Sequence, residues 1–513
     1  MTARGLLARV AALLVVGVGV ALPVAYVWFQ EAERSVVVGA HEATMSPNFS
    51  GHVTIGAGPL LPELRLRSPA PLGIGLDLVL RDSPVTDLQE ILARDAAIAS
   101  QPDGEIARIS GEVTDLATDA LVKGAAAGVF AMIVATAAWR AIGPARRRDL
   151  LDQWPPGPRE GGVMVTMTVA ALVALWVFLP HGGATRDVAW VPIRDEFPRL
   201  PQDPRLENVE ISVGAATSGG KALVDGAVST YTASLEFYNE LAEKTRDIEV
   251  RQPEEGQTTA LVVTDRHDNI GMDPVAKAVA DAAQASFVID LGDDTSTGAS
   301  WEAFSLSSLR ETFKELPILA VAGNHDTGDF IRDQMDQLDF TVLDGEPIEF
   351  EGITFLGESD PRSSGLTAGY EGDPDENNAT IRAQAQRLAE VACTPERTVS
   401  VIAVHSAASS KAAAEAGCAD LTIAGHLHRQ VGPDVVEGEY GRTTTLVTGS
   451  TGGAIYAFSL GTKLRRDAQV TLLTFEDGRA VGLQVVTFEP GAIIDVGEYV
   501  PVGPALPDTV DAP

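Results

Sequence analysis

The chain has 513 residues, which is enough for two or three domains. Its 71 acidic residues against 38 Lys and Arg give a formal net charge of -33, which excludes nucleic-acid binding through a basic surface that contacts phosphates. The apolar fraction of 45% is ordinary for a globular protein, but these residues concentrate in three blocks of the first third of the chain.

The three apolar blocks each approach the length of about 20 residues that an α-helix needs to cross a bilayer. They lie within residues 1–29, 121–139 and 163–180. The first block could instead be a cleaved signal peptide. However, its apolar stretch is too long, and the "WFQEAER" that ends it offers no small-x-small cleavage pattern. We therefore predict an uncleaved anchor and three transmembrane helices in all.

The arginines predict the orientation of these helices. Arg4 and Arg9 precede the first helix, and the loop 140–162 carries five Arg against three acidic residues. Loops rich in Arg stay in the cytoplasm. The expected protein is a multi-pass protein of the cell membrane, with residues 30–120 and everything after residue 180 outside the cytoplasm.

Two regions between these helices mix short strand-like pieces with a helical segment. The region 30–120 contains "GHVTIGAG" and "GLDLVLRD" before the helical pattern "VTDLQEILARDAAIAS". The region 181–256 contains "VEISVGA" before the helical pattern "STYTASLEFYNELAEKTRDIEV". Since both are expected on the same side of the membrane, they could pair into one small α+β extracytoplasmic module. Neither region contains a pattern that indicates chemistry.

From residue 257 to about 490, strands alternate with helices, as is typical of an α/β layered domain. The Pro-rich, acidic segment 491–513 is expected to be a disordered tail. The predicted organisation has eight parts in chain order. They are a cytoplasmic end with the first transmembrane helix (1–29), an extracytoplasmic loop region (30–120), the second helix (121–139), a cytoplasmic Arg-rich loop (140–162), the third helix (163–180), an extracytoplasmic module (181–256), a catalytic domain (257–490) and the tail (491–513).

Cys393 and Cys418 are the only cysteines, and both lie in the expected α/β domain. On the outer face of a membrane they could form a disulfide. Two separate buried thiols are the alternative, and the sequence leaves this choice open.

Five apolar runs in this domain each end in Asp, Asn or His. The carboxyl end of a strand is where α/β sheets bind ligands. Of the eight His in the chain, all five in this domain stand at such ends. The residues that follow the five runs are Asp265 to His267, Asp293 and Asp294, Asn324 to Asp326, His405, and His426 to His428.

These residue types indicate a metal site. Side chains two apart on an extended segment point the same way, so D-x-H and H-x-H can each bind one ion with both residues. None of these clusters contains a cysteine, which excludes a Cys-type structural zinc site or an iron–sulfur cluster there. The mixture of imidazole, carboxylate and amide suits Mn, Fe or Zn. Seven candidate ligands are too many for one ion and fit two divalent ions that share a bridging carboxylate.

The five motifs resemble those of the calcineurin-like metallophosphoesterase superfamily. The pattern D-x-H, G-D, G-N-H-[D/E], H and G-H-x-H stands here as "DRH", "GDD", "GNHD", "VH" and "GHLH", in that order. The resemblance covers about 257–490. It implies an αββα sandwich, in which two β-sheets are flanked by helices; here it is preceded by three transmembrane helices and the small α+β region.

The resemblance also implies a role for each residue. A hydroxide between the two metals would attack phosphorus directly. His325 would stabilise the transition state or protonate the leaving oxygen, and Asp326 would orient the ring of His325 by accepting its hydrogen bond. Arg266 and Asp294 receive no role. The implied ligands are Asp265, His267 and His428 for the first metal, Asn324, His405 and His426 for the second, and Asp293 for both.

The predicted function is a membrane-anchored, metal-dependent hydrolase of phosphate esters with its active site outside the cytoplasm. The substrate could be a monoester, a diester, a nucleotide, a lipid or a cell-wall phosphate, and the oligomeric state is open. The alternative is a metal-binding sensor or receptor domain that has lost turnover and uses the outer module to bind a partner. Because such a site has no need of a histidine that is not a ligand, His325 favours the enzyme.

Overall fold

The computed structural model describes two compact units, Met1–Val36 with Glu42–Asp82 and Ile109–Lys221, and Val37–His41 with Ser83–Arg108 and Ala222–Pro513. The residues that it describes are 3–39, 41–56, 62–68, 70–81, 98, 102–147, 189–198, 206–213, 218–365, 369–394, 398–455 and 462–502.

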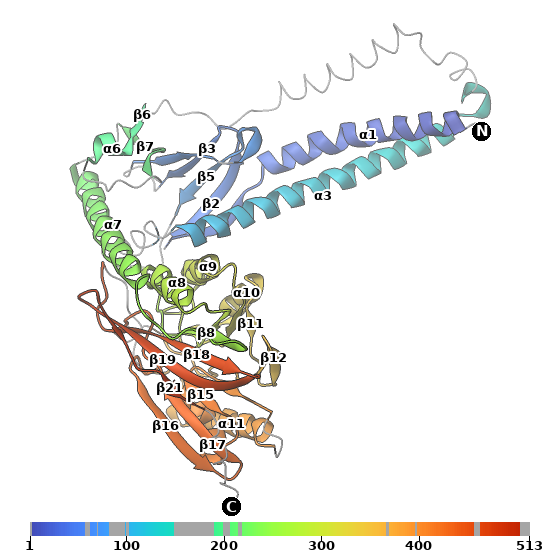
Figure 1. The fold of residues 1–513 in the computed structure, drawn as a ribbon. Helices are drawn as coiled ribbons and strands as arrows, with labels where there is room; N and C mark the ends of the chain where they lie inside the picture. Colours follow the sequence, from blue (N-terminus) through green and yellow to red (C-terminus); the bar gives the residue numbers. More distant parts are fainter. Residues whose placement is uncertain are drawn as a thin grey trace, which may run out of the picture. The chain divides into compact units, whose positions relative to one another are not determined.

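Two long helices dominate the first unit, α1 (Ala3–Gln30) and α3 (Asp103–Ala141). By length and composition, Leu13–Gln30 and Asp103–Ala141 could each cross a membrane. The two helices run side by side (Figure 1), and small residues form their contact. A Cβ added at Gly124 would stand 2.5 Å from the Ala21 carbonyl oxygen, and one at Gly128 would stand 2.6 Å from that of Gly17. The predicted helix 163–180 lies outside the described residues.

A seven-stranded sheet completes this unit. The regions 30–120 and 181–256 both contribute strands to it, because β4 pairs antiparallel with β7, with Leu64 opposite Ile211. The two regions therefore pair as the sequence suggested. Of the expected helix at 85–100, only Ile98 lies within the described residues, and it is helical. The sheet order is β1-β2-β5-β3-β4-β7-β6, with β1 Arg34–Val38, β2 His41–Asn48, β3 His52–Gly56, β4 Leu64–Arg67, β5 Gly75–Leu80, β6 Ala189–Pro192 and β7 Val209–Val213; the short helices are η1 Pro71–Gly73 and α6 Ile193–Glu196.

Two sheets form the second unit. The first has the order β11-β10-β9-β8-β18-β19-β20, with β21 also on β19, and the second has the order β12-β13-β14-β15-β17-β16. The strands of the first sheet are β8 Gln257–Val263, β9 Phe287–Asp290, β10 Ile318–Ala320, β11 Thr341–Val342, β18 Ala468–Glu476, β19 Arg479–Glu489, β20 Ile493–Val496 and β21 Val500–Pro501. Those of the second are β12 Ile348–Phe350, β13 Ile353–Leu356, β14 Val401–Ala403, β15 Leu421–Ala424, β16 Val431–Gly438 and β17 Gly441–Val447.

Helices cover the outer face of each sheet, which gives the predicted α–β–β–α layering. Alternate residues of one strand face opposite ways: Leu261 and Val263 pack among the helices, whereas Ala260 and Val262 pack toward the second sheet. Figure 1 shows α8 and α9 beside the sheet that contains β8 and β18, and α11 beside the other sheet. The helices of this unit are α7 Ser218–Thr245, η3 Ile270–Met272, α8 Asp273–Ala282, η4 Ser300–Glu302, α9 Ala303–Thr312, α10 Asp329–Gln337, α11 Pro374–Ala392 and α12 Ala407–Ala416.

The prediction of a disordered tail from residue 491 is wrong for its first residues. Ile493–Val496 and Val500–Pro501 both pair antiparallel with β19. Apolar and polar residues alternate within "AIIDVGEYV", as is typical of strands that pair at the edge of a sheet. The Pro and acidic residues of the segment hide this pattern in the sequence. Residues 503–513 lie outside the described part of the chain.

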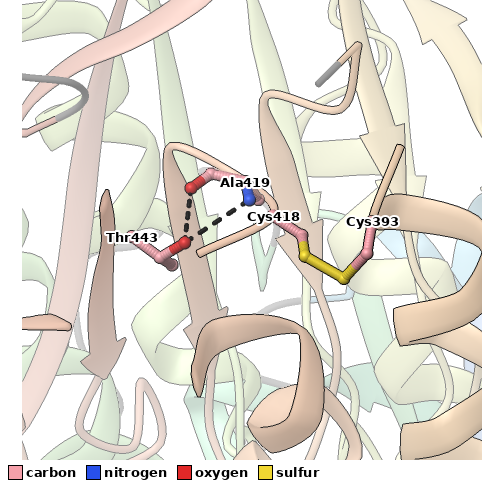
Figure 2. The surroundings of a disulfide bond; sticks show 4 residues. All are labelled: Cys393, Cys418, Ala419 and Thr443. Atoms are coloured by element: carbon pink, nitrogen blue, oxygen red, sulfur yellow. Dashed lines mark hydrogen bonds between the residues drawn. A yellow bond between two sulfur atoms is a disulfide. The ribbon is translucent and has the colours of Figure 1, made fainter. Parts of the chain in front are cut away.

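Cys393 and Cys418 form a disulfide, so the alternative of two separate thiols is wrong. The bond connects the residue that ends α11 to the residues between α12 and β15 (Figure 2). Beside it, the Ala419 carbonyl oxygen accepts a hydrogen bond from the Thr443 hydroxyl at 2.6 Å, which ties this turn to β17. The disulfide therefore fixes α11 to the start of a central strand.

Candidate metal centre

The five expected strand ends meet in space. Strands β8, β9 and β10 are parallel neighbours in the first sheet, and β14 and β15 are parallel neighbours in the second. Their carboxyl ends therefore lie at the same edge of each sheet, and the polar residues that follow them form one buried group.

The loops that carry these residues are not extended, so the expected reason for the D-x-H spacing is wrong. The backbone φ angle is positive at Asp265 (49°), His267 (44°), His426 (70°) and His428 (52°), a left-handed conformation that non-glycine residues rarely adopt. The two neighbouring loops stabilise this conformation, because the Asp265 amide donates to the Gly292 carbonyl at 2.8 Å and the His267 amide to that of Asp293 at 3.0 Å. Strained backbone of this kind is typical of functional sites.

Glycines allow these loops to approach closely. A Cβ at Gly323, in "GNHD", would stand 2.1 Å from Oδ1 of Asp293. A Cβ at Gly425, in "GHLH", would stand 2.5 Å from Oδ2 of Asp265. At both positions, any residue larger than glycine would clash with a candidate ligand.

One group of candidate ligands contains Asp265, His267, Asp293 and His428, whose ligand atoms lie within 4.8 Å of one another. Nε2 of His267 is 3.0 Å from Nε2 of His428, which is 3.2 Å from Oδ1 of Asp265. Two nitrogens bound to one ion at about 2.1 Å and at right angles are separated by about 3.0 Å. The spacing of these two rings therefore fits a shared ion.

A second group contains Asp293, His405 and His426, again with ligand atoms within 4.8 Å of one another. Asn324 adjoins it, with Oδ1 3.0 Å from Nε2 of His405. Asp293 belongs to both groups. Its Oδ2 is buried, accepts no hydrogen bond from the described residues, and lies 3.1 Å from Nε2 of His405 and 3.8 Å from Nε2 of His267. A buried carboxylate oxygen in this position fits an oxygen that two ions share.

Backbone carbonyls orient two of the histidine rings toward the site. Nδ1 of His267 meets the Thr295 carbonyl at 3.2 Å and Nδ1 of His405 meets the Leu291 carbonyl at 2.8 Å, so each ring directs Nε2 into the site.

The electrostatics divide the four candidate ligand histidines into two pairs. Burial lowers the pKa of His267 to about 3 and, with the charge of His405, that of His426 to about 4. Both imidazoles are therefore neutral near pH 7, as a ligand must be. Against the effect of burial, the charge of Asp293 raises the pKa of His405 to about 10, and that of Asp265 raises the pKa of His428.

The expected contact between His325 and Asp326 is absent among the described hydrogen bonds, which corrects that prediction. Nδ1 of His325 donates instead to the Ser296 carbonyl at 3.0 Å, and the ring lies edge-on to His267, with the centroids 5.1 Å apart. The carboxylate of Asp326 accepts four hydrogen bonds from the loop that carries Asp293 and one from its own loop. The donors are the amides of Asp293 (2.6 Å), Asp294 (3.2 Å), Thr295 (2.9 Å) and Gly323 (3.0 Å) and the Thr295 hydroxyl (2.8 Å).

Asp326 has these donors because the loops that follow β9 and β10 fold against each other. Burial, with the charges of Asp294 and Asp293, raises the pKa of Asp326 to about 7, and the amide hydrogen bonds act in the opposite direction. Asp326 therefore positions the backbone around Asp293 and makes no described hydrogen bond to a ring in the site.

Arg266 and Asp294, which sequence reasoning left without a role, form a buried ion pair beside the site. Nη1 of Arg266 lies 2.7 Å from Asp294, and Nη2 lies 2.7 Å from Asp273 at the start of α8. All three side chains are almost fully buried. The pair connects the "DRH" loop to the "GDD" loop. In the sequence, the only indication of this ion pair is that Arg266 lies within "DRH" and Asp294 within "GDD".

Arg362 and Tyr370, in the segment between β13 and α11, were also missed. The Arg362 guanidinium lies 4.0 Å from the centroid of the Tyr370 ring, and the Tyr370 hydroxyl is 2.8 Å from Nε2 of His426. Burial raises the pKa of Tyr370 to about 12, so the hydroxyl keeps its proton at neutral pH. The signal was a sixth apolar run, "ITFLG", which is likewise followed by polar residues, "ESDPR".

A family model and solved structures match part of this chain. Residues 259–463 match the family model of the calcineurin-like phosphoesterase superfamily domain. A search of curated protein sequences finds no match. Among solved structures, one described as a novel archaeal phosphodiesterase is 13% identical over 47% of this chain and 99% of its own, with a TM-score of 0.25. A protein from Thermus thermophilus is 11% identical over 47% and 98%, with a TM-score of 0.27. By its match to that family model, this part of the chain, residues 259–463, is a calcineurin-like phosphoesterase domain, the domain of a phosphoester hydrolase.

Proposed function

We propose that this protein is a membrane-anchored phosphoesterase that uses two divalent metal ions and acts outside the cytoplasm. The observation that carries the two-ion site is the position of Asp293, whose buried Oδ2 lies between the histidines of both candidate groups. With a single ion, one of the two histidine pairs would bind no metal. The pairs are His267 with His428 and His405 with His426.

Each group would hold one ion of Mn, Fe or Zn, the ions that suit imidazole mixed with carboxylate and amide oxygen. The bound ions would polarise the phosphate and lower the pKa of a water molecule, so that the water can attack phosphorus near neutral pH. The residues proposed as ligands are Asp265, His267 and His428 for one ion, Asn324, His405 and His426 for the other, and Asp293 for both.

His325 is the proposed proton donor to the leaving oxygen. Its Nδ1 is occupied by the Ser296 carbonyl, which leaves Nε2 as the nitrogen that can meet a substrate. His325 as a residue is 7% exposed, and its backbone amide donates to Oδ1 of Asp293 at 2.8 Å. This contact sets the distance between the proton donor and the shared carboxylate.

The anchor is proposed from α1 and α3. The apolar side chains on their outward faces are exposed, including Leu22 at 61% and Phe130 at 67%. Transmembrane helices associate through close contact of small residues. The hydrophobic effect does not drive this association, because lipid tails are as apolar as the side chains that face them. The arginine pattern directs the phosphoesterase domain to the outside, and the disulfide suits that location since such bonds persist where the environment is oxidising.

The full-length protein in detergent, loaded with Mn, tests the enzyme proposal. We expect hydrolysis of an aryl phosphate monoester or diester that Asp293→Asn abolishes. If the wild-type protein binds two metal ions but hydrolyses neither substrate with Mn, Fe or Zn, the alternative of a metal-binding sensor is favoured.

Reporter fusions test the topology separately. A reporter that is active only outside the cytoplasm should be active after residue 513 and inactive within 140–162. The opposite pattern would overturn the orientation without affecting the chemistry.

A further inference from the structure

We propose that Arg362 binds a phosphoryl oxygen of the substrate beside the metal centre, with Asp360 and Tyr370 positioning its guanidinium. This inference rests on the proposed function, because the anion that it binds is the phosphate of that substrate. Neither the five motifs nor the metal ligands include this segment of the chain.

The segment that carries Arg362 is attached to the metal loops at two points. The Asp360 amide donates to the Ala322 carbonyl at 2.9 Å, and the Ser364 amide donates to the Asn324 carbonyl at 2.8 Å. Asn324 is a candidate ligand, and Ala322 is two residues before it. Arg362 lies between these two attachments, so its backbone is held close to the second group of ligands.

The guanidinium is held in one orientation. Nε donates to Oδ1 of Asp360 at 2.8 Å and Nη2 donates to Oδ2 at 2.6 Å, while the planar group lies over the ring of Tyr370. Among the hydrogen bonds of the described residues, Nη1 makes none. The side chain is only 7% exposed, so this nitrogen is a preorganised donor rather than a mobile surface group.

Tyr370 places this donor next to the metal centre. Its ring is stacked on His426, with the centroids 5.9 Å apart and the planes 17° from parallel, and its hydroxyl reaches Nε2 of the same histidine. The guanidinium, the phenol ring and a candidate ligand therefore follow one another in contact. Arginine is the side chain best suited to phosphate, since its planar donors match the phosphoryl oxygens and its charge is permanent.

A purely structural role is the competing explanation, because Asp360 is buried and requires a cation. The two roles differ in what they predict for anion binding. A structural arginine would affect folding or metal content, whereas a phosphate-binding arginine affects the affinity for an anion in a protein that keeps both metals.

Inorganic phosphate binding to the full-length, Mn-loaded protein in detergent, measured by calorimetry, is the test. Arg362→Ala should weaken phosphate binding at least about ten-fold, as loss of a charged hydrogen bond does, with two metal ions per chain retained. Arg387→Ala is the matched control, since Arg387 pairs with Glu358 near the start of this segment but is 53% exposed, and it should bind phosphate as wild type does. Phosphate affinity within about two-fold of wild type in Arg362→Ala would overturn the proposal.

Arg362→Lys covers the case in which the alanine variant loses metal or does not fold. Lysine keeps the charge that Asp360 requires but lacks the planar donors, so phosphate binding should weaken at least about three-fold. Wild-type phosphate affinity in a folded, metal-loaded Arg362→Lys protein would also overturn the proposal. Because binding is measured without turnover, this result is separate from whether the wild-type protein hydrolyses an ester.

Discussion

The substitution Asp326→Asn separates what the structure assigns to Asp326 from what the motif resemblance implied. If Asp326 oriented His325, the variant would lose turnover and keep its metals. In the structure, Asp326 accepts five hydrogen bonds, three of them from the amides of Asp293, Asp294 and Thr295. We therefore expect the variant to lose stability and metal affinity together, because the backbone around Asp293 loses its anchor.

The magnitude follows from the number of donors. An asparagine amide group must replace one carboxylate oxygen, and either choice leaves at least one buried N–H facing another donor. Loss of one hydrogen bond to a charged group costs about 1.5–3 kcal/mol. In a domain of this size, about 1 kcal/mol corresponds to about 2–4 °C in Tm. The expected decrease in Tm is therefore at least about 3 °C.

Thermal denaturation at pH 8 measures this decrease, since the pKa of Asp326 is about 7 and the carboxylate is ionised there. The measurement in EDTA reports the loss of hydrogen bonds alone, and the measurement with Mn adds the loss of metal affinity. Asp333→Asn, an exposed residue of α10, makes the same chemical change away from the site. If Asp326→Asn keeps both metals and its wild-type Tm but loses turnover, the positioning role is wrong and the orienting role is restored.

Four further tests address other parts of the site and domain. Asp293→Asn should lose metal and activity together, whereas His325→Ala should lose activity with both metals retained; metal analysis of the purified variants checks this, and equal metal loss would remove His325 as proton donor. Cys393→Ser opens a loop with a sequence separation of 25 residues and should lower the free energy of unfolding by about 3.5 kcal/mol in urea denaturation. A reduced wild-type protein as stable as the oxidised one would contradict this. Arg266→Met leaves two buried carboxylates without their cation and should cost about 3–5 kcal/mol by the same measurement. Tyr370→Phe removes the hydroxyl from His426 and should weaken Mn binding about 10-fold in calorimetric titration, while unchanged affinity would show that the hydroxyl does not tune that ligand.

The site is predictable from the sequence because each of five apolar runs is followed by residues that can bind a metal. The prediction succeeded because the carboxyl ends of parallel strands meet at one edge, so residues as far apart in sequence as His267 and His428 become neighbours. The four-layer fold followed in the same way, since fully buried runs such as "ALVV" in β8 require cover on both faces.

The role of Asp326 could not be read from the sequence. Its donors lie 31 to 33 residues earlier in the chain, except for Gly323, and most of them are backbone amides. Backbone groups look alike at every position, so no residue pattern identifies which amides will face a carboxylate. Arg362 has a related explanation: the sixth apolar run, "ITFLG", locates its segment, but its contact with Tyr370 depends on the path of a loop that no motif specifies.

The positions of the left-handed residues explain why these supporting contacts matter. Non-glycine residues in the left-handed region cost roughly 1 kcal/mol or more each. Besides the four residues of "DRH" and "GHLH", Asp293 also has a positive φ, of 57°. Five such residues cost roughly 5 kcal/mol or more, a large part of the stability of an ordinary domain. The loops can keep this conformation only because hydrogen bonds and ion pairs with surrounding groups stabilise it.

Asp326 and Arg266 are two described side chains that stabilise the "DRH" and "GDD" loops in this way. Asp326 accepts three amides of the "GDD" loop, and Arg266 connects that loop to "DRH" through Asp294. Neither is a candidate ligand, yet the ligand positions depend on both. The last two residues of "GNHD" thus divide differently from what the motif alone suggested: His325 is oriented by the Ser296 carbonyl, and Asp326 holds the backbone from which Asp293 reaches both groups. Metal affinity should therefore fall about 10-fold or more when either of these two buried side chains is replaced, although neither binds the ions.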